Sequence, residues 1–384
     1  MTHILYIYSE ISIKGGTDKV LVEKANYLVH HGYQVTIVTE AQMGRPLSFM
    51  IDPSVKHIDI GLDFNSQYSK GPLGRARTYF SLIHQYKKRL KSVLEQEKPD
   101  IIISIMGRSL DFIASLQTNS IKLVEAHTTK KNLRSLHLME ERGFVYRIIA
   151  KYLRRKMCHN VAKLDGIIVL TQQDADSWNE AKRVFVIPNA VPYYPETGGS
   201  LINKQVIMVG RYNDAKGYDY LIPAWDIVHK KHLDWTLQVY GSGELYEQVV
   251  QWINERHLQD TIILHEPVNN IIEKYKESSI CVLSSRYEGF SLVLLEAMAC
   301  GVPVVSFDCP YGPRNIIRNG EDGLLVEEKN PQALADGICR FIEDESLRQQ
   351  FGAKARENIR RFSKEAIMQQ WMDTFNSLIR EKKK

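Results

Sequence analysis

The chain has 384 residues, which is longer than one ordinary hydrophobic core and predicts two domains of about 150 residues or more. Hydrophobic residues make up 44% and charged residues 25%, as in globular proteins rather than disordered or fibrous ones. The net charge of +5 permits anionic ligands or a lipid surface but does not require nucleic acid, so no nucleic-acid partner is expected.

The N-terminal sequence and the cysteines indicate a cytoplasmic protein. "MTHILYIYSEISIKGG" holds an apolar run of only about six residues followed by an acid, which is typical of a first strand and not of a signal peptide. No run approaches the roughly 20 apolar residues that a membrane-spanning helix needs. The five cysteines form no CxxC pair and no metal-binding spacing, as expected in a reducing compartment.

In the first half of the chain, short apolar runs alternate with longer helical patterns. Near-continuous apolar strands are required by a parallel sheet that is covered on both faces. The alternation therefore predicts an α/β domain with a doubly wound sheet. The expected strands are "HILYIY", "QVTIVT", "DIIISI", "IKLVEA", "DGIIVL" and "VFVIP".

The pattern breaks at residues 193–200, "YYPETGGS", whose proline and glycines predict a linker. It then restarts with "QVIMVG", "WTLQVYG", "TIILHE", "SICVLSS", "PVVSF" and "GLLVE". We therefore expect an N-terminal domain over 1–195 and a second, Rossmann-like domain over 196–362. Residues 363–384 predict a final helix capped by Ser363, which we expect to pack back on the N-terminal domain.

Two loops carry residues suited to binding an anion at the carboxyl ends of parallel strands. Gly15 and Gly16 follow the first strand and would let backbone amides approach an anion at a helix start, although an ordinary flexible loop fits equally well. Arg211 and Lys216 follow the first strand of the second half. Arginine offers a fork to phosphate oxygens and lysine a mobile charge, but two solvated surface cations are the alternative.

The segment "SSRYEGFSLVLLEAMACGVPVVSFD" (284–308) places two acids around a predicted helix start. Ser291 is a suitable N-cap, so a helix is expected from Leu292 towards Gly301. Glu288 then precedes the helix, Glu296 lies inside it, and free backbone amides between them form a positive helix end. This arrangement suits a diphosphate with hydroxyl-bearing groups on both sides, as in a nucleotide sugar. The alternative is two acids that pair with nearby lysines.

Together these motifs resemble the retaining glycosyltransferases of family 4, which have the GT-B architecture. The resemblance covers most of the chain, and each fragment alone is less specific than the set. The fragments are "KGGTDKV", "EAH" (125–127), "VIPNAV" (186–191), "VGRYNDAKGYD", "EGFSLVLLEAMACGVPVV" and "NGEDGLLV". "DCPYGPRNII" resembles members that transfer hexose or N-acetylhexosamine from UDP-sugars in surface-polysaccharide assembly.

The resemblance implies a GT-B fold, in which two Rossmann-like domains face each other across a cleft, and it implies roles for single residues. Glu288 and His127 would approach the donor sugar, and Arg211 and Lys216 would hold its diphosphate and act in catalysis. Without the resemblance, a lone histidine such as His127 is more often structural. The remaining donor-binding residues implied are Gly15, Gly16, Val268 (near the base), Gly289, Phe290, Ser291, Leu292 and Glu296 (at the ribose).

The reaction implied is transfer from a UDP-sugar to a glycan acceptor, with the diphosphate as leaving group and no metal or other cofactor. The alternatives are a GDP-mannose-dependent transferase, a nucleotide-sugar epimerase on the same fold, and a silent subunit of another transferase. The sequence departs from the family pattern at Thr17, Asp18 and Lys19, and again at Asn315, where an acid is common. These departures bear on which donor sugar and which acceptor are used and leave the expected diphosphate-binding residues, Arg211 and Lys216, unchanged.

A basic amphipathic stretch lies in the N-terminal half. Residues 142–157, "RGFVYRIIAKYLRRKM", mix apolar and basic side chains, and "YKKRLKSVLEQEK" (86–98) adds further charge. Such a helix lies on anionic lipid or forms the solvated face of an ordinary domain helix. Because the acceptor of this family is often lipid-linked, a peripheral position on the inner face of the plasma membrane is expected.

Overall fold

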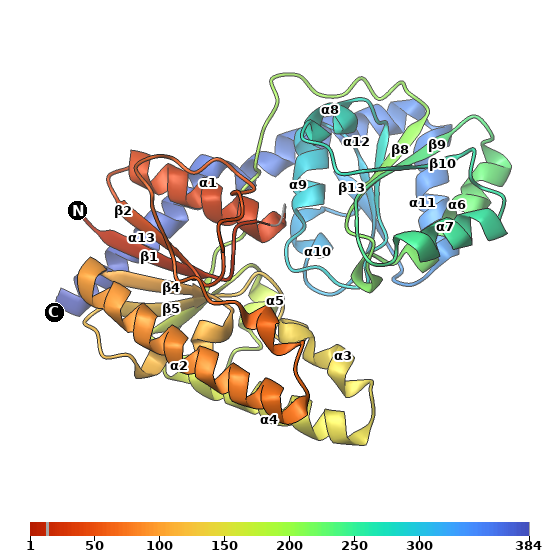
Figure 1. The fold of residues 1–384 in the computed structure, drawn as a ribbon. Coiled ribbons are helices and arrows are strands. Elements are labelled where there is room, and N and C mark those ends of the chain that lie inside the picture. Colours follow the sequence, from red (N-terminus) through yellow and green to blue (C-terminus); the bar gives the residue numbers. More distant parts are fainter. Residues whose placement is uncertain (13–14, 384) are drawn as a thin grey trace. The chain divides into compact units, whose positions relative to one another are not determined.

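In a computed structural model, which describes residues 1–12 and 15–383, the chain forms two compact units (Figure 1). Unit 1 comprises Met1–Pro188 and Ile367–Lys384, and unit 2 comprises Asn189–Ala366. The division therefore precedes the boundary expected after residue 195, and the last segment of the chain belongs to the same unit as the first.

The sheet of unit 1 is parallel throughout, with the strand order β3-β2-β1-β4-β5-β6-β7. The six apolar runs expected as strands are all present. The sequence analysis missed β3, an edge strand of partly exposed residues without an apolar run. The strands are β1 (His3–Tyr8), β2 (Gln34–Thr39), β3 (Lys56–Asp59), β4 (Ile101–Ile105), β5 (Ile121–Glu125), β6 (Gly166–Val169) and β7 (Val184–Val186).

Helices cover the faces of this sheet and explain why its central strands are fully buried. Figure 1 shows the last helix, α13, alongside the sheet of unit 1. Its Phe375 is buried, with the ring centroid 6.1 Å from that of Tyr33, and Ser363 Oγ accepts a hydrogen bond from Ala366 N (3.2 Å), as predicted for the cap. The helices are α1 (Gly16–His30), α2 (Pro72–Glu97), α3 (Leu136–Glu140), α4 (Phe144–Ala162), α5 (Gln172–Ala175) and α13 (Lys364–Lys383).

Unit 2 repeats this architecture with the parallel strand order β10-β9-β8-β11-β12-β13. Each of the six strands expected from the sequence is present. They are β8 (Gln205–Val209), β9 (Thr236–Tyr240), β10 (Ile262–His265), β11 (Ile280–Leu283), β12 (Val304–Phe307) and β13 (Gly323–Val326). The prediction of two doubly wound α/β domains is confirmed.

The core of unit 2 forms where α6 and α11 pack together over the sheet. Trp225 of α6 is fully buried, and its indole N–H donates to Thr261 Oγ1 at 3.2 Å. The helices are α6 (Tyr218–Lys231), α7 (Tyr246–Glu255), α8 (Ile271–Lys276), α9 (Leu292–Ala299), α10 (Pro313–Ile316), α11 (Pro331–Glu343) and α12 (Glu345–Asn358).

In both sheets the strand order reverses beside the first strand: between β1 and β4 in unit 1, and between β8 and β11 in unit 2. Connections leave the two strands at such a point in opposite directions, so their loops separate and open a crevice outside the carboxyl ends. A ligand site of unit 2 is therefore expected in the loops that follow β8 and β11.

Candidate functional site

The loops after β8 and β11 carry the charged residues selected from the sequence. The first loop runs from Gly210 through the short 3-10 helix η5 (Asp214–Lys216) into α6. The second runs from Ser284 through Glu288 to the start of α9. Because β8 and β11 are neighbours in the sheet, the two loops begin side by side.

Backbone contacts fix the first loop against the end of β11. Ser284 Oγ donates a hydrogen bond to Lys216 O at 2.8 Å, and Arg286 N donates to Ala215 O at 2.8 Å. Gly217 has φ +63°, and a Cβ there would lie 2.2 Å from Ser284 O. Only glycine fits, since any side chain would push the loop away from β11 and displace Lys216.

Lys216 of the first loop and Glu288 of the second loop form an ion pair. Lys216 Nζ lies 2.7 Å from Glu288 Oε1, with side-chain exposures of 18% and 13%. Ser285 Oγ donates to the same oxygen at 2.7 Å. Among the described residues, no hydrogen bond to Oε2 of Glu288 is found, so that oxygen can accept one from a ligand hydroxyl.

Gly312, which follows β12, packs against Glu288. A Cβ at Gly312 would lie 2.6 Å from Glu288 Cβ, so a larger residue would displace the carboxylate. The Glu288 side chain is thus held from three directions: by Lys216, by Ser285 and by the backbone around Gly312.

Helix α9 starts at Leu292, as predicted, but Ser291 does not cap it with its side chain. Ser291 is 3% exposed, and its Oγ has no hydrogen-bond partner within residues 1–12 and 15–383. The capping prediction was therefore wrong for this side chain. The loop is held instead by Asn189, whose Nδ2 donates to Phe290 O at 3.2 Å. A buried hydroxyl and the first amides of α9 are left available to an acceptor-rich group such as a phosphate.

Glu296 lies in the middle of α9 and is 7% exposed. The hydroxyl of buried Tyr275 donates to Glu296 Oε2 at 3.3 Å. Burial, and next the charge of Glu296, raise the pKa of Tyr275 well above its ordinary value, so the phenol keeps its proton and remains a donor. The structure thus places both predicted acids on the segment that starts α9, with different partners.

The other residues expected in the donor site of unit 2 occupy more open positions. Arg211 is exposed, and its guanidinium makes no hydrogen bond or ion pair with the described part of the chain. Val268 is half-buried in the loop after β10. Gly289 and Leu292 lie on either side of buried Phe290 and Ser291 in the turn that leads into α9.

Unit 1 holds the remaining predicted residues. Gly15 precedes α1 in an extended conformation (φ −101°, ψ 159°) and Gly16 is the first residue of that helix, while Lys14 of the motif lies outside the described residues. His127 follows β5 with its side chain 10% exposed, and its Nε2 is 3.0 Å from Glu125 Oε1.

The sequence analysis missed two residues that donate hydrogen bonds to the predicted acids, Ser285 to Glu288 and Tyr275 to Glu296. Ser285 is recognisable in hindsight as a polar residue directly after a buried strand. Tyr275 carries no such signal, because it precedes Glu296 by 21 positions and its role depends on how α8 packs.

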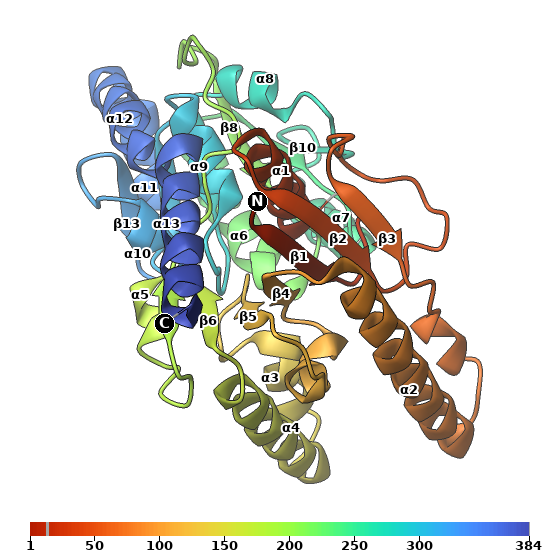
Figure 2. The same ribbon diagram turned by 90° about the vertical axis from the view of Figure 1, so that its left-hand side faces the viewer.

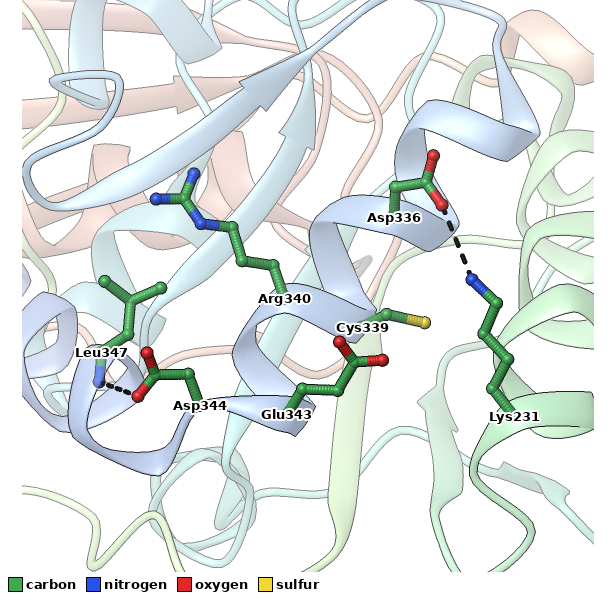
Figure 3. Close-up of a pocket in the computed structure, with 7 residues that line it drawn as sticks. All are labelled: Lys231, Asp336, Cys339, Arg340, Glu343, Asp344 and Leu347. Carbon is green, nitrogen blue, oxygen red and sulfur yellow. Dashed lines mark hydrogen bonds and ion pairs between the residues drawn. The ribbon is translucent and has the colours of Figure 1, made fainter.

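Figure 3 shows a different pocket of unit 2, near the end of α6. His232, Cys339 and Glu343 have potential metal-ligating atoms within 4.8 Å of one another there. Lys231 and Arg340 line the same pocket, and their charges disfavour a bound cation. Since a helix rises about 1.5 Å per residue, the length of α6 separates this pocket from Lys216 by roughly 20 Å.

Comparisons with known proteins cover most of the chain. Residues 14–193 match the description "Glycosyltransferase Family 4" and residues 200–358 match "Glycosyl transferases group 1". The chain belongs to the family 4 glycosyltransferases.

Some relatives of this glycosyltransferase match it over nearly their whole length. An uncharacterized glycosyltransferase of Haemophilus influenzae is 28% identical over 376 residues, covering 97% of this chain and 99% of that protein. The amylovoran biosynthesis glycosyltransferase AmsD of Erwinia amylovora is 26% identical, over 98% of this chain and 100% of its own. A crystal structure of a Staphylococcus aureus TarM mutant with fondaparinux, alpha-GlcNAc-glycerol and UDP is 19% identical, with a TM-score of 0.76 over 98% of this chain and 100% of that one. The expected GT-B fold is thereby confirmed.

We expect Lys216→Ala to lower the kcat of this glycosyltransferase roughly 100-fold or more while raising the KM for the glycosyl donor far less. This outcome is expected if the lysine charge stabilises a leaving group whose negative charge grows only in the transition state. Initial-rate kinetics at several donor concentrations would measure both constants.

Lys204→Ala provides the matched control, because Lys204 forms an exposed ion pair with Asp234 in the same unit. An unchanged kcat for Lys216→Ala would mean that Lys216 only neutralises Glu288.

Proposed function

We propose that this glycosyltransferase transfers a hexose or N-acetylhexosamine from a UDP-sugar to a glycan acceptor in surface-polysaccharide biosynthesis, with retention at the anomeric carbon. The observation that carries the proposal is the group at the strand-order reversal of unit 2. A buried hydroxyl without a partner among the described residues (Ser291), the first amides of α9 and the Lys216–Glu288 pair lie on two adjoining loops. This set matches a diphosphate with a sugar beside it.

Two relatives support the nature of the substrates. The Erwinia amylovora protein is named for amylovoran biosynthesis, and the TarM crystals contain UDP and alpha-GlcNAc-glycerol. We assign the same donor class to this chain. We further propose that the acceptor is lipid-linked, since surface polysaccharides are assembled at a membrane.

The chemistry needs a departing diphosphate and an attacking hydroxyl. The acceptor oxygen forms a bond to the anomeric carbon, the bond from that carbon to the diphosphate oxygen breaks, and the hydroxyl proton passes to the departing diphosphate. Lys216, Arg211 and the start of α9 offset the charge that develops there. We assign the Oε2 atom of Glu288 to a sugar hydroxyl and not to attack on the anomeric carbon, while Lys216 and Ser285 contact its Oε1. We therefore propose front-face attack through a short-lived oxocarbenium-like state.

The two acids should differ in which part of the donor they bind. If Glu296 contacts the ribose, Glu296→Gln weakens both free UDP and the UDP-sugar. If Glu288 contacts the sugar, Glu288→Gln leaves UDP binding nearly intact and weakens only the UDP-sugar. Each lost charged hydrogen bond costs about 1.5–3 kcal/mol, which calorimetry with UDP and UDP-N-acetylglucosamine resolves.

Glu273→Gln on neighbouring α8 serves as the control, since Glu273 is 57% exposed and forms a surface ion pair with Lys276. Equal losses of UDP affinity in the Glu288 and Glu296 variants would contradict the division of roles.

We propose that the reaction needs no metal, because Lys216, Arg211 and the helix start supply positive charge at the diphosphate. Activity is accordingly expected to persist after dialysis against EDTA and to change little on adding Mg²⁺ or Mn²⁺. Complete loss in EDTA with recovery in Mg²⁺ or Mn²⁺ would refute this.

Turnover assays separate this function from its alternatives. A panel of UDP- and GDP-sugars with lipid-linked acceptors distinguishes a UDP-dependent from a GDP-mannose-dependent transferase. Consumption of the sugar nucleotide without any acceptor would instead support an epimerase.

We also propose that α4 contacts an anionic membrane surface. Within the described residues no helix is long and apolar enough to cross a bilayer, yet Figure 2 shows α4 projecting beyond the sheet of unit 1. Arg147, Lys151 and Arg155 are exposed between its apolar residues. The combination of apolar and basic side chains fits lipid headgroups. The exposed apolar side chains are Phe144, Val145, Tyr146, Ile148, Ile149 and Tyr152.

Replacing Phe144 and Ile148 together by serine should reduce the fraction bound to vesicles containing phosphatidylglycerol roughly tenfold or more, because two large apolar side chains no longer enter the lipid. Co-sedimentation measures this fraction. The matched control replaces Ile202 and Leu233 of unit 2, which are similarly exposed (65% and 73%), by serine. Equal binding by all three proteins, or equal binding to neutral vesicles, would contradict the assignment.

A further inference from the structure

A buried ion pair lies in the interior of unit 1, beside the predicted histidine. Lys24 of α1 is 3% exposed and Glu125, the last residue of β5, is 1% exposed. Lys24 Nζ lies 2.6 Å from both carboxylate oxygens of Glu125. Removing two charges from water is costly, and such a pair often adds little to stability compared with apolar residues of the same volume. Its presence therefore requires another explanation.

Glu125 connects this pair to His127, whose Nε2 lies 3.0 Å from the oxygen that also contacts Lys24. Within the described residues Nε2 makes no directed hydrogen bond, so its attraction to this oxygen is electrostatic. Burial raises the pKa of Glu125, but the charge of Lys24, followed by the contact with His127, lowers it to about 2, and the carboxylate stays ionised. A negative oxygen facing Nε2 favours the proton on that nitrogen and leaves Nδ1 as the acceptor.

Two aromatic rings also lie close to the Lys24 ammonium. Nζ lies 3.8 Å from the ring centroid of Trp371 on α13 and 5.0 Å from that of Tyr6 on β1. Both rings are buried. Burial raises the pKa of Tyr6 well above its ordinary value, so Tyr6 is neutral. A buried cation in contact with a carboxylate and two aromatic rings has little freedom to move.

We propose that Trp371 and Lys24 are positioning residues for His127. The indole of Trp371 holds the Lys24 ammonium against Glu125, and Glu125 in turn fixes the orientation and tautomer of the His127 ring. The expected effect on turnover rests on the proposed function, in which His127 approaches the transferred sugar. The expected effect on the orientation and tautomer of the His127 ring is independent of that function.

The pair also balances charge beside His127. With Lys24 and Glu125 both ionised, the imidazole lies next to a neutral unit. Removing only the lysine would leave a buried carboxylate without a compensating cation, whereas removing both charges would leave no charged group to orient the ring.

The experiment compares the tautomer of His127 in the full chain and its variants, using long-range ¹H–¹⁵N spectra assigned by His127→Gln. The wild-type chain is expected to show the Nε2–H form. Trp371→Leu and the double variant Lys24→Met with Glu125→Gln are expected to show a mixture of both forms. Trp371→Phe keeps an aromatic face over Lys24 and is expected to restore the wild-type signals. The double variant avoids an unpaired buried charge, so it remains informative if Lys24→Met alone does not fold.

Leu378→Ala is the matched control, because Leu378 is also buried on α13 but lies about two helical turns from Trp371. Wild-type signals in Trp371→Leu, or the same change in Leu378→Ala, would overturn the proposal.

Kinetics provide a second readout. Misplacing a reacting group by about 1 Å can cost roughly 100-fold, so kcat should fall between 10- and 100-fold in Trp371→Leu. UDP affinity should change much less than kcat, since the residues assigned to the base and the ribose, Val268 and Glu296, lie in unit 2. If no UDP-sugar is turned over by the wild-type chain, the proposed function fails while the spectra still decide the role of Trp371 and Lys24. A loss of UDP affinity that matches the loss of kcat would mean general damage and would contradict positioning.

Discussion

The packing of the loop after β8 against the end of β11 determines where unit 2 can do chemistry. A parallel sheet with helices on both faces hides all of its side chains except those beyond the strand ends. The backbone at Gly217 lies so close to Ser284 O that no Cβ fits between them. This contact brings Lys216 to Glu288 across 72 positions of sequence, and the ion pair, the Ser285 hydrogen bond and the start of α9 all depend on it.

The two lysine–glutamate pairs of this chain have the same chemistry and different environments. Lys24 and Glu125 are almost inaccessible and have further partners on both sides, so neither can be released without exposing a buried charge. Lys216 and Glu288 are partly exposed, so a ligand can reach both side chains. A ligand that brings phosphate oxygens to the lysine and hydroxyls to the acid replaces the second pair at little cost.

The sequence was sufficient for most of the fold because the strands are continuous apolar runs such as "HILYIY" and "QVIMVG", bounded by polar residues. It failed for β3, "KHID", whose place at the sheet edge needs no apolar run. Lys216 and Glu288 were identifiable by type and position, but not their pairing, because β9 and β10 separate β8 from β11 along the chain. The role of Ser291 was misassigned, since a serine before a helix usually accepts an amide hydrogen bond and here does not.

Unit 1 is not a continuous stretch of sequence, because α13 joins it only after all of unit 2. During synthesis residues 1–188 emerge first, and domains generally fold in the order in which they emerge. Until Trp371 is synthesised, Lys24 lacks its contact with the indole ring and the Lys24–Glu125 pair is not fully buried. Unit 2 can therefore complete its fold before unit 1 does, and the last turns of the chain determine when the whole molecule reaches its final state. A chain that ended before α13 would keep the fold of unit 2, but unit 1 would lack the helix that buries its Lys24–Glu125 pair.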